Sequence, residues 1–190
     1  MSVLDRLVRK DDAPRDEPGN PLLVIDRMER RDLREVMPIE EAVYPKPWTE
    51  RVFIDEIEMM RRGQRLYLVG RVGRTLVGYC GLLFADDAAH VTNIAVHHDW
   101  RSRGIATEFM LELAERAIEA GFGALTLEVR HTNVAAQELY RRFGFVPAGV
   151  RKRYYENTDD AIVMWCQDIQ SEAFADRLRS IESTRPRGER

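Results

Sequence analysis

The chain has 190 residues, of which 44% are hydrophobic and 32% are charged, and its formal net charge is −3. This length and composition are typical of one compact globular domain with a terminal extension. The slight acidic excess argues against a protein that mainly coats nucleic acid, because such a protein needs a basic surface. We therefore expect a soluble domain without a nucleic-acid partner.

Cysteine usage and hydropathy favour the cytoplasm. Cys80 and Cys166 lie inside apolar runs, which predicts buried free thiols rather than a disulfide or a metal site. The beginning of the chain lacks the apolar core of a signal peptide, and no apolar run approaches the roughly 18 residues of a membrane span. No membrane partner is expected. No metal is expected either, because no known ligand spacing relates the four histidines, His90, His97, His98 and His131.

The first half of the chain combines an irregular arm with regular elements. Residues 1–20 mix both signs of charge with prolines and have few apolar groups, which predicts a mobile arm before a domain at 21–170. Thr49 is an expected helix N-cap, and Asp86-Asp87 marks an expected turn. Periodicity and composition predict a strand at 22–28, helices at 31–44 and 49–62, and strands at 65–73, 74–85 and 89–96.

The second half follows the same logic. The segment 171–190 is an expected tail, in which Phe174, Leu178 and Ile181 predict a short helix. Before it, the patterns predict a helix from Ile105 to Gly121, a half-polar strand at 125–130, a helix at 134–143 stopped by Gly144, and strands at 145–155 and 160–169. This order predicts an α/β fold in which helices pack around a central mixed sheet.

The loop RSRG at residues 101–104 directly precedes a predicted helix. Backbone amides at a helix start are unpaired, and the helix dipole adds a partial positive charge there. Gly104 would let the backbone approach an oxygen atom closely, while Arg101 and Arg103 would add charge. The loop therefore predicts an anion site suited to a pyrophosphate, although a plain turn with solvated arginines would explain the same residues.

The run RSRGIA at 101–106 matches the (Q/R)-x-x-G-x-(G/A) loop of the GNAT superfamily of N-acetyltransferases, which the chain resembles over about 22–169. Within that superfamily, TNIAVHHDWRSRGIA, LEVRHTNVAAQELYRRFGFVPAGVRKRYY and DAIVMW resemble ribosomal-protein alanine N-acetyltransferases of the RimI type and other N-terminal acetyltransferases. The resemblance implies the GNAT fold, a mixed and mostly antiparallel sheet of about seven strands flanked by about four helices. It also implies acetyl-coenzyme A (acetyl-CoA) as co-substrate.

The resemblance places acetyl-CoA along one strand and on the loop after it. The pantetheine arm would pair with the strand backbone as an added strand would, and the pyrophosphate would bind the amides from Ser102 to Thr107. Asn133 matches an asparagine that contacts the cofactor. The complete set of implied cofactor contacts is Ile94, Ala95, Val96, Arg101, Ser102, Arg103, Gly104, Ile105, Ala106, Thr107 and Asn133.

Two residues match the catalytic pair of the resembled family. Glu128, on the polar face of its strand, corresponds to the general base, which would act through a water molecule. Tyr140 corresponds to the general acid, and its ordinary pKa of about 10 suits protonation of a thiolate. Without the resemblance, Glu128 would be a solvated carboxylate and Tyr140 a core aromatic residue.

The expected acceptor is the N-terminal amine of a protein, for example a ribosomal protein. An α-amino group titrates roughly 2.6 pKa units below a lysine side chain, so deprotonating lysine costs about 3.5 kcal/mol more at neutral pH. The resemblance implies an acceptor slot between Tyr44 and Trp48 on one side and Tyr154 and Tyr155 on the other. Acetylation of a lysine or a small amine, and a noncatalytic acyl-CoA-binding regulator, remain as alternatives. A monomer or weak dimer is expected.

Overall fold

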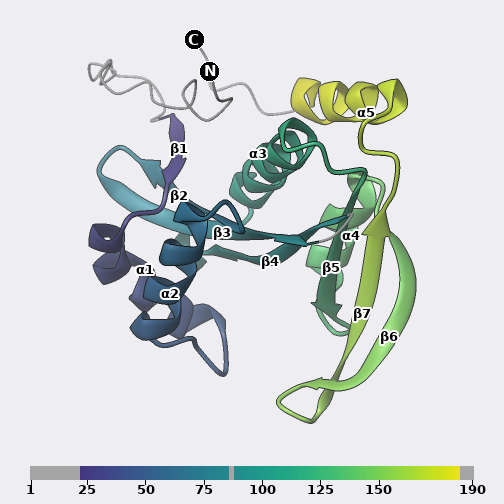
Figure 1. Cartoon of the computed structure of the whole chain (residues 1–190). Coiled ribbons are helices and arrows are strands. Elements are labelled where there is room, and N and C mark those ends of the chain that lie inside the picture. The colour runs from purple at the N-terminus through teal and green to yellow at the C-terminus, as the bar shows by residue number, and fades with distance from the viewer. Residues whose placement is uncertain (1–21, 86–87, 185–190) are drawn as a thin grey trace.

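The computed structural model describes residues 22–85 and 88–184, and these residues form one seven-stranded sheet in the order β1-β2-β3-β4-β5-β7-β6 (Figure 1). All neighbouring strands are antiparallel except β4 and β5. The sheet confirms the predicted mixed, mostly antiparallel architecture. Its strands are β1 Leu23–Arg27, β2 Arg65–Val72, β3 Thr75–Ala85, β4 Ala88–Val96, β5 Ala124–Arg130, β6 Val146–Tyr155 and β7 Asp159–Cys166.

Five α-helices accompany the sheet, where about four were expected around it; the fifth lies in the C-terminal segment. Thr49 takes the extended N-cap conformation before the second helix, but its side chain makes no capping hydrogen bond. The helices are α1 Leu33–Val43, α2 Glu50–Arg61, α3 Ile105–Glu119, α4 Val134–Arg142 and α5 Glu172–Ser183, with short 3-10 turns η2 Arg30–Asp32 and η3 His98–Trp100.

Three sequence expectations fall outside the described residues. They are the mobile arm at 1–20, the turn at Asp86-Asp87 and the last part of the expected tail, at 185–190. Within the described part, Cys80 and Cys166 are buried free thiols, as predicted. None of the described helices combines the length and apolarity that crossing a membrane requires.

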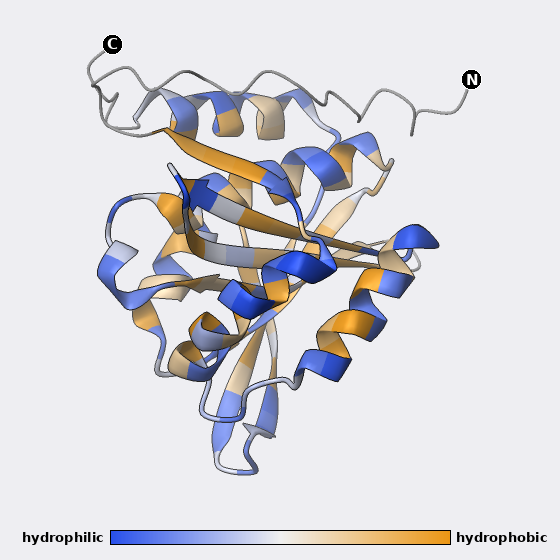
Figure 2. Ribbon diagram, turned by 90° about the vertical axis from the view of Figure 1, so that its left-hand side faces the viewer, coloured by the Kyte–Doolittle hydropathy of each residue, from blue (hydrophilic) through white to orange (hydrophobic). Residues whose placement is uncertain are grey.

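Each face of the sheet buries its own apolar cluster (Figure 2). Helices α1 and α2 cover one face, where Phe53 is fully buried among Val36, Tyr67 and Tyr79. Helix α3 covers the other face, and α5 extends that cluster through Phe174, Leu178 and Ile181. Burial of these two stripes is the main source of the fold's stability, because apolar burial is the dominant favourable term in folding.

Strands β4 and β5 pair only at their beginnings. The parallel register runs from Ala88 opposite Ala124 to Val91 opposite Leu127 and then ends. A bulge in β4 leaves Thr92 without a partner on β3. Beyond it, the backbone of Ile94–Val96 pairs with β3 but not with β5, so no described strand covers one edge of this segment, where the Val96 carbonyl accepts the Arg101 side chain.

Helix α3 approaches the sheet closely because two glycines leave room for Phe109. A Cβ atom at Gly78 would meet the Phe109 ring at 2.9 Å and would also collide with the carbonyl oxygen of Ala95 on β4. A Cβ atom at Gly70 would meet the same ring at 2.7 Å. The missing side chains therefore set both the helix distance and the position of the open segment of β4.

We expect Gly78→Ala to lower the free energy of unfolding by about 1–3 kcal/mol, because overpacking forces neighbouring backbone to move. Gly149→Ala is the matched control, since no atom lies within 4 Å of a Cβ built at Gly149. It should change the free energy by less than about 0.5 kcal/mol. Urea denaturation of both variants measures the difference, and equal effects would contradict the close packing at Gly78.

Candidate active site

Glu128 lies on β5 just beyond the point where β4 and β5 separate. Its neighbours Leu127 and Val129 are buried in the cluster under α3, so strand alternation turns Glu128 toward the opposite face, which α1 and α2 cover. The Glu128 side chain is only 8% exposed. A carboxylate in such a place needs polar partners, because burial of an unpaired charge is costly.

Two side chains from different strands contact the Glu128 carboxylate. His90 Nε2 on β4 lies 3.0 Å from Oε2, and Arg151 Nη1 on β6 lies 3.0 Å from Oε1. The hydrogen bond from His90 is the main reason why the pKa of Glu128 lies below its usual range; burial opposes it, and the charges of His90 and Arg151 add to it. Glu128 is therefore ionised at neutral pH.

The sequence reasoning missed both partners of Glu128. His90 alternates with Ala89 and Val91, which face the α3 cluster, so strand alternation already placed it on the polar face shared with Glu128. For Arg151 no comparable signal exists, because its contact depends on how β6 folds back along β7.

Tyr140 on α4 is half-buried and packs against Phe145, with ring centroids 5.8 Å apart. Burial first, and then the nearby Tyr155, raise the pKa of the Tyr140 hydroxyl above its ordinary value. The ordinary pKa of about 10 therefore does not apply to this hydroxyl. The hydroxyl stays protonated across the neutral range.

Three tyrosines that are far apart in sequence influence one another electrostatically, and one of them, Tyr155, contacts the backbone of Glu128. Burial raises the pKa of Tyr44, in the α1–α2 connection, and the nearby hydroxyls of Tyr140 and Tyr155 raise it further. Tyr155 donates a hydrogen bond to the backbone carbonyl of Glu128 at 3.1 Å. Mainly because of burial, the pKa of Tyr155 is raised to about 12. The hydroxyl of the expected acid thus lies among residues expected to bind the acceptor.

The other two expected acceptor residues differ in their surroundings. Trp48 packs edge-on against Phe53, with centroids 5.5 Å apart, so its ring belongs to the apolar cluster. Tyr154 is 47% exposed and meets the Tyr155 ring at 5.1 Å. Tyr44 and Tyr155 are therefore the two expected acceptor residues that lie near Tyr140. Trp48 packs into the apolar cluster behind the α1–α2 connection, and Tyr154 lies at the solvent-exposed surface.

A buried carboxylate that was not predicted from the sequence, Glu40, holds the α1–α2 connection against the sheet. Glu40 is 2% exposed, accepts the backbone N–H of Trp48 at 2.7 Å and accepts the hydroxyl of Tyr79. Burial raises the pKa of Glu40, and the two donors oppose that rise. Its position on the buried face of α1, one residue after Ile39, was the available signal.

The loop before α3 has the geometry expected of an anion site. Gly104, at the helix N-cap, has a left-handed φ of 82°. The amides of Thr107 and Glu108 bond to the Gly104 carbonyl. Within the described part of the chain, the amides of residues 102–106 have no backbone acceptor, so five donors remain open where six were expected.

The charged residues around these amides are held away from them. Arg101 donates from Nε to the carbonyl of Val96 at 3.2 Å, and the Arg103 guanidinium lies 4.8 Å from the centre of the Trp100 ring. Asn133 caps α4 by accepting the N–H of Ala136 at 3.1 Å. Whether Asn133 also contacts the cofactor stays a prediction.

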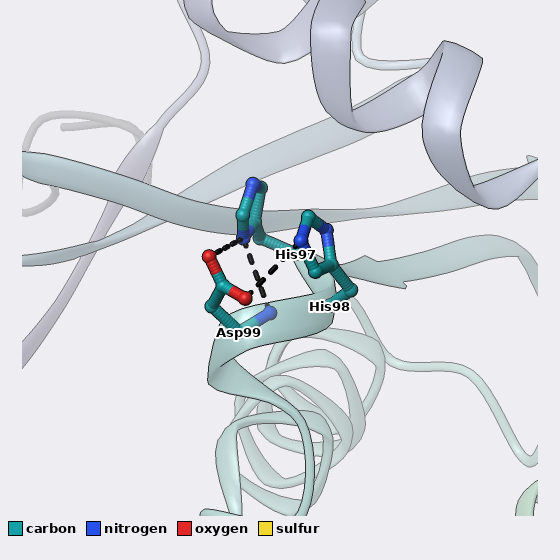
Figure 3. Close-up of side chains that lie close together, drawn as sticks. All are labelled: His97, His98 and Asp99. Carbon is teal, nitrogen blue, oxygen red and sulfur yellow. Dashed lines mark hydrogen bonds and ion pairs between the residues drawn. The ribbon is translucent and has the colours of Figure 1, made fainter.

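The turn that joins β4 to this loop contains the one group of three potential metal ligands among the described residues (Figure 3). The Asp99 carboxylate lies 3.1 Å from His98 Nε2 and 3.8 Å from His97 Nδ1, and the Asp99 N–H donates to His97 Nδ1 at 3.3 Å. These contacts close the turn at the surface. The expected absence of a metal stays a prediction.

Residues 33–145 match the acetyltransferase (GNAT) family, and the chain belongs to this family. It is therefore an acetyltransferase of the class that uses acetyl-CoA.

Among its relatives, the ribosomal protein bS18-alanine N-acetyltransferase of Escherichia coli (strain K12) is 32% identical over 143 residues, which cover 74% of this chain and 94% of the relative. A Bacillus subtilis (strain 168) relative that bears this name provisionally is 35% identical over 142 residues, covering 74% of this chain and 93% of its own. The crystal structure of the E. coli ribosomal-protein-S18-alanine N-acetyltransferase has a TM-score of 0.70 at 27% identity, covering 77% of this chain and 94% of that one.

We expect Gly104→Ala to weaken acetyl-CoA binding by about tenfold or more, because strain and a new Cβ disturb charge-assisted hydrogen bonds to the pyrophosphate. Gly121→Ala is the matched control, with a φ of 86° and, like Gly104, no atom within 4 Å of the added Cβ. Both variants should lose about 1 kcal/mol of stability from the left-handed conformation. Calorimetric titration with acetyl-CoA separates them, and equal affinities would refute the role of the loop.

Proposed function

We propose that the protein transfers the acetyl group of acetyl-CoA to the α-amine of a protein N-terminus. The observation that supports this proposal best is the ionised Glu128 carboxylate just beyond the point where β4 and β5 separate, with the protonated Tyr140 hydroxyl on the helix that follows β5. A noncatalytic acyl-CoA-binding protein would have no use for this acid and base pair.

Acetyl-CoA would bind in the gap between the two strands. The free backbone edge of Ile94–Val96 would pair with the amides and carbonyls of pantetheine, and the open amides of residues 102–106 would bind the pyrophosphate. This arrangement directs the thioester toward the Glu128 side of the sheet.

The reaction would be a direct attack of the amine on the thioester. The amine nitrogen forms a bond to the carbonyl carbon while the carbon–sulfur bond breaks, and the proton lost from nitrogen passes through a water molecule to Glu128. Tyr140 would return a proton to the departing sulfur. Its raised pKa ensures that the proton is present, and burial would raise the basicity of a thiolate beside it in the same way.

The proposed acceptor is a protein N-terminus of the bS18 type that begins with alanine. The names of two relatives at 35% and 32% identity support it. The contact of Tyr155 with the backbone of Glu128 and its influence on Tyr44 support it as well, because both tyrosines are expected to line the acceptor slot. We further propose that the protein acts in the cytoplasm, where new N-termini arise.

We expect Glu128→Gln and Tyr140→Phe each to lower kcat by the roughly 10² to 10⁴ typical of acid-base groups, with acetyl-CoA affinity retained. Glu138→Gln is the control for charge removal, because Glu138 is 64% exposed on α4. This substitution should leave kcat unchanged. Steady-state kinetics and calorimetry give both quantities. A wild-type kcat in both variants would refute the roles of Glu128 as general base and Tyr140 as general acid.

The acceptor class can be decided by offering peptides that begin with Ala, Ser, Thr or Met, with a free or blocked terminus and an internal lysine. Mass spectrometry then locates the acetyl group. We expect modification of the free α-amine, with the Ala peptide preferred. Acetylation confined to the lysine would refute the α-amine proposal.

We expect the rising limb of kcat/KM against pH to follow the acceptor amine rather than Glu128. The lowered pKa of Glu128 means that its carboxylate becomes protonated only below its usual range, so it stays ionised while an α-amine with a pKa of about 8 titrates. Two peptides whose amine pKa values differ should shift the limb by that difference. A limb that stays in place would show that a group on the protein controls it.

A further inference from the structure

Arg151 occupies the oxygen of Glu128 that the reaction needs. Oε2 of the carboxylate is covered by His90, so Oε1, which lies 3.0 Å from Arg151 Nη1, is the oxygen left for an incoming group. The proposed function brings a cation, the ammonium form of the acceptor, toward this oxygen, to which it passes its proton through a water molecule. In the structure the guanidinium already stands there.

The two arginines near this end of the site are held very differently. Arg130 pairs with Asp159 at 2.7 Å and with Glu156, and its guanidinium stacks on Tyr155 at 4.3 Å. Among the described residues, Arg151 pairs with no carboxylate other than Glu128. Arg130 is thus fixed from several sides, whereas Arg151 is held at one point.

The exposure of the Arg151 side chain shows that its guanidinium can leave Glu128 at a small cost in free energy. Its side chain is 56% exposed, against 8% for Glu128, so the guanidinium can pass into water without becoming a buried unpaired charge. It can also remain over the Tyr154 ring, whose centre lies 5.4 Å away. Glu128 cannot lose its partner so easily, because a buried carboxylate requires a compensating cation or donor.

We propose that Arg151 is a placeholder cation: it compensates Glu128 while the acceptor is absent, and the ammonium group of the acceptor displaces it. The inference rests on the proposed function, since it assigns the displacing group to the amine substrate. Arg151 is thus a residue that tunes acceptor affinity. The exchange keeps one positive charge on the carboxylate throughout, and it opens Oε1 only when an amine is in place.

The test compares Arg151→Gln with Lys152→Gln in full steady-state kinetics with the free-terminus peptide. Lys152 is exposed, neighbours Arg151 on β6 and pairs with no described carboxylate, so both variants remove one charge from the same strand. Arg151→Gln should lower the acceptor KM by about two- to fivefold, the competition that one partly exposed ion pair can exert, with kcat and acetyl-CoA affinity unchanged. Lys152→Gln and the charge-conserving Arg151→Lys should keep the wild-type KM.

Two results would overturn the inference. A lower kcat with an unchanged or raised KM would show that Arg151 assists the reaction, and values equal to those of Lys152→Gln would show that its contact with Glu128 has no effect on the acceptor. If the wild type acetylates only lysine, the α-amine proposal fails, but the same comparison applies with the lysine peptide because its ammonium meets the same guanidinium. A wild type that acetylates no amine overturns both proposals.

Discussion

The separation of β4 from β5 after four paired residues is the constraint on which the rest of the site depends. Two parallel strands that stayed paired would use up the backbone edge of Ile94–Val96 and would leave no space beside Glu128. Because pairing stops, one strand keeps unused hydrogen-bonding groups and the other exposes the end of its polar face. In the proposed complex, acetyl-CoA bound along β4 would then lie beside the buried Glu128 carboxylate.

In the proposed reaction, this gap would allow groups from the two faces of the sheet to act on the same substrate. Glu128 belongs to the face covered by α1 and α2, whereas Tyr140 packs into the cluster under α3. In a closed sheet these side chains would be separated by the backbone layer. Tyr140 and Tyr155 both raise the pKa of Tyr44, and Tyr155 raises the pKa of Tyr140. Burial that raises the pKa of each hydroxyl also keeps each one a hydrogen-bond donor.

Periodicity predicted the sheet, the helices and the polar face of Glu128, because those features depend on residues close in sequence. The three side chains that control the site most directly, Glu40, His90 and Arg151, were not assigned. Their partners lie 8 to 39 residues away in sequence, and only the packing of α1, β4 and β6 brings them together. The pKa of Tyr140 could not be predicted either, since it depends on burial rather than on residue type.

The bulge at Thr92 determines more than the local pairing of β4. Ala89 and Val91 face the cluster under α3, yet Ala95 faces the cluster under α1 and α2, although all three are odd-numbered. One extra residue has reversed the alternation, so that His90 lies on the face of Glu128, whereas Ile94 and Val96 pack against the cluster under α3. The length of this strand therefore matters more than its composition. Many residue types would fit, but an insertion or deletion of one residue between His90 and Ile94 would move the side chains on one side of the change to the opposite face of the sheet.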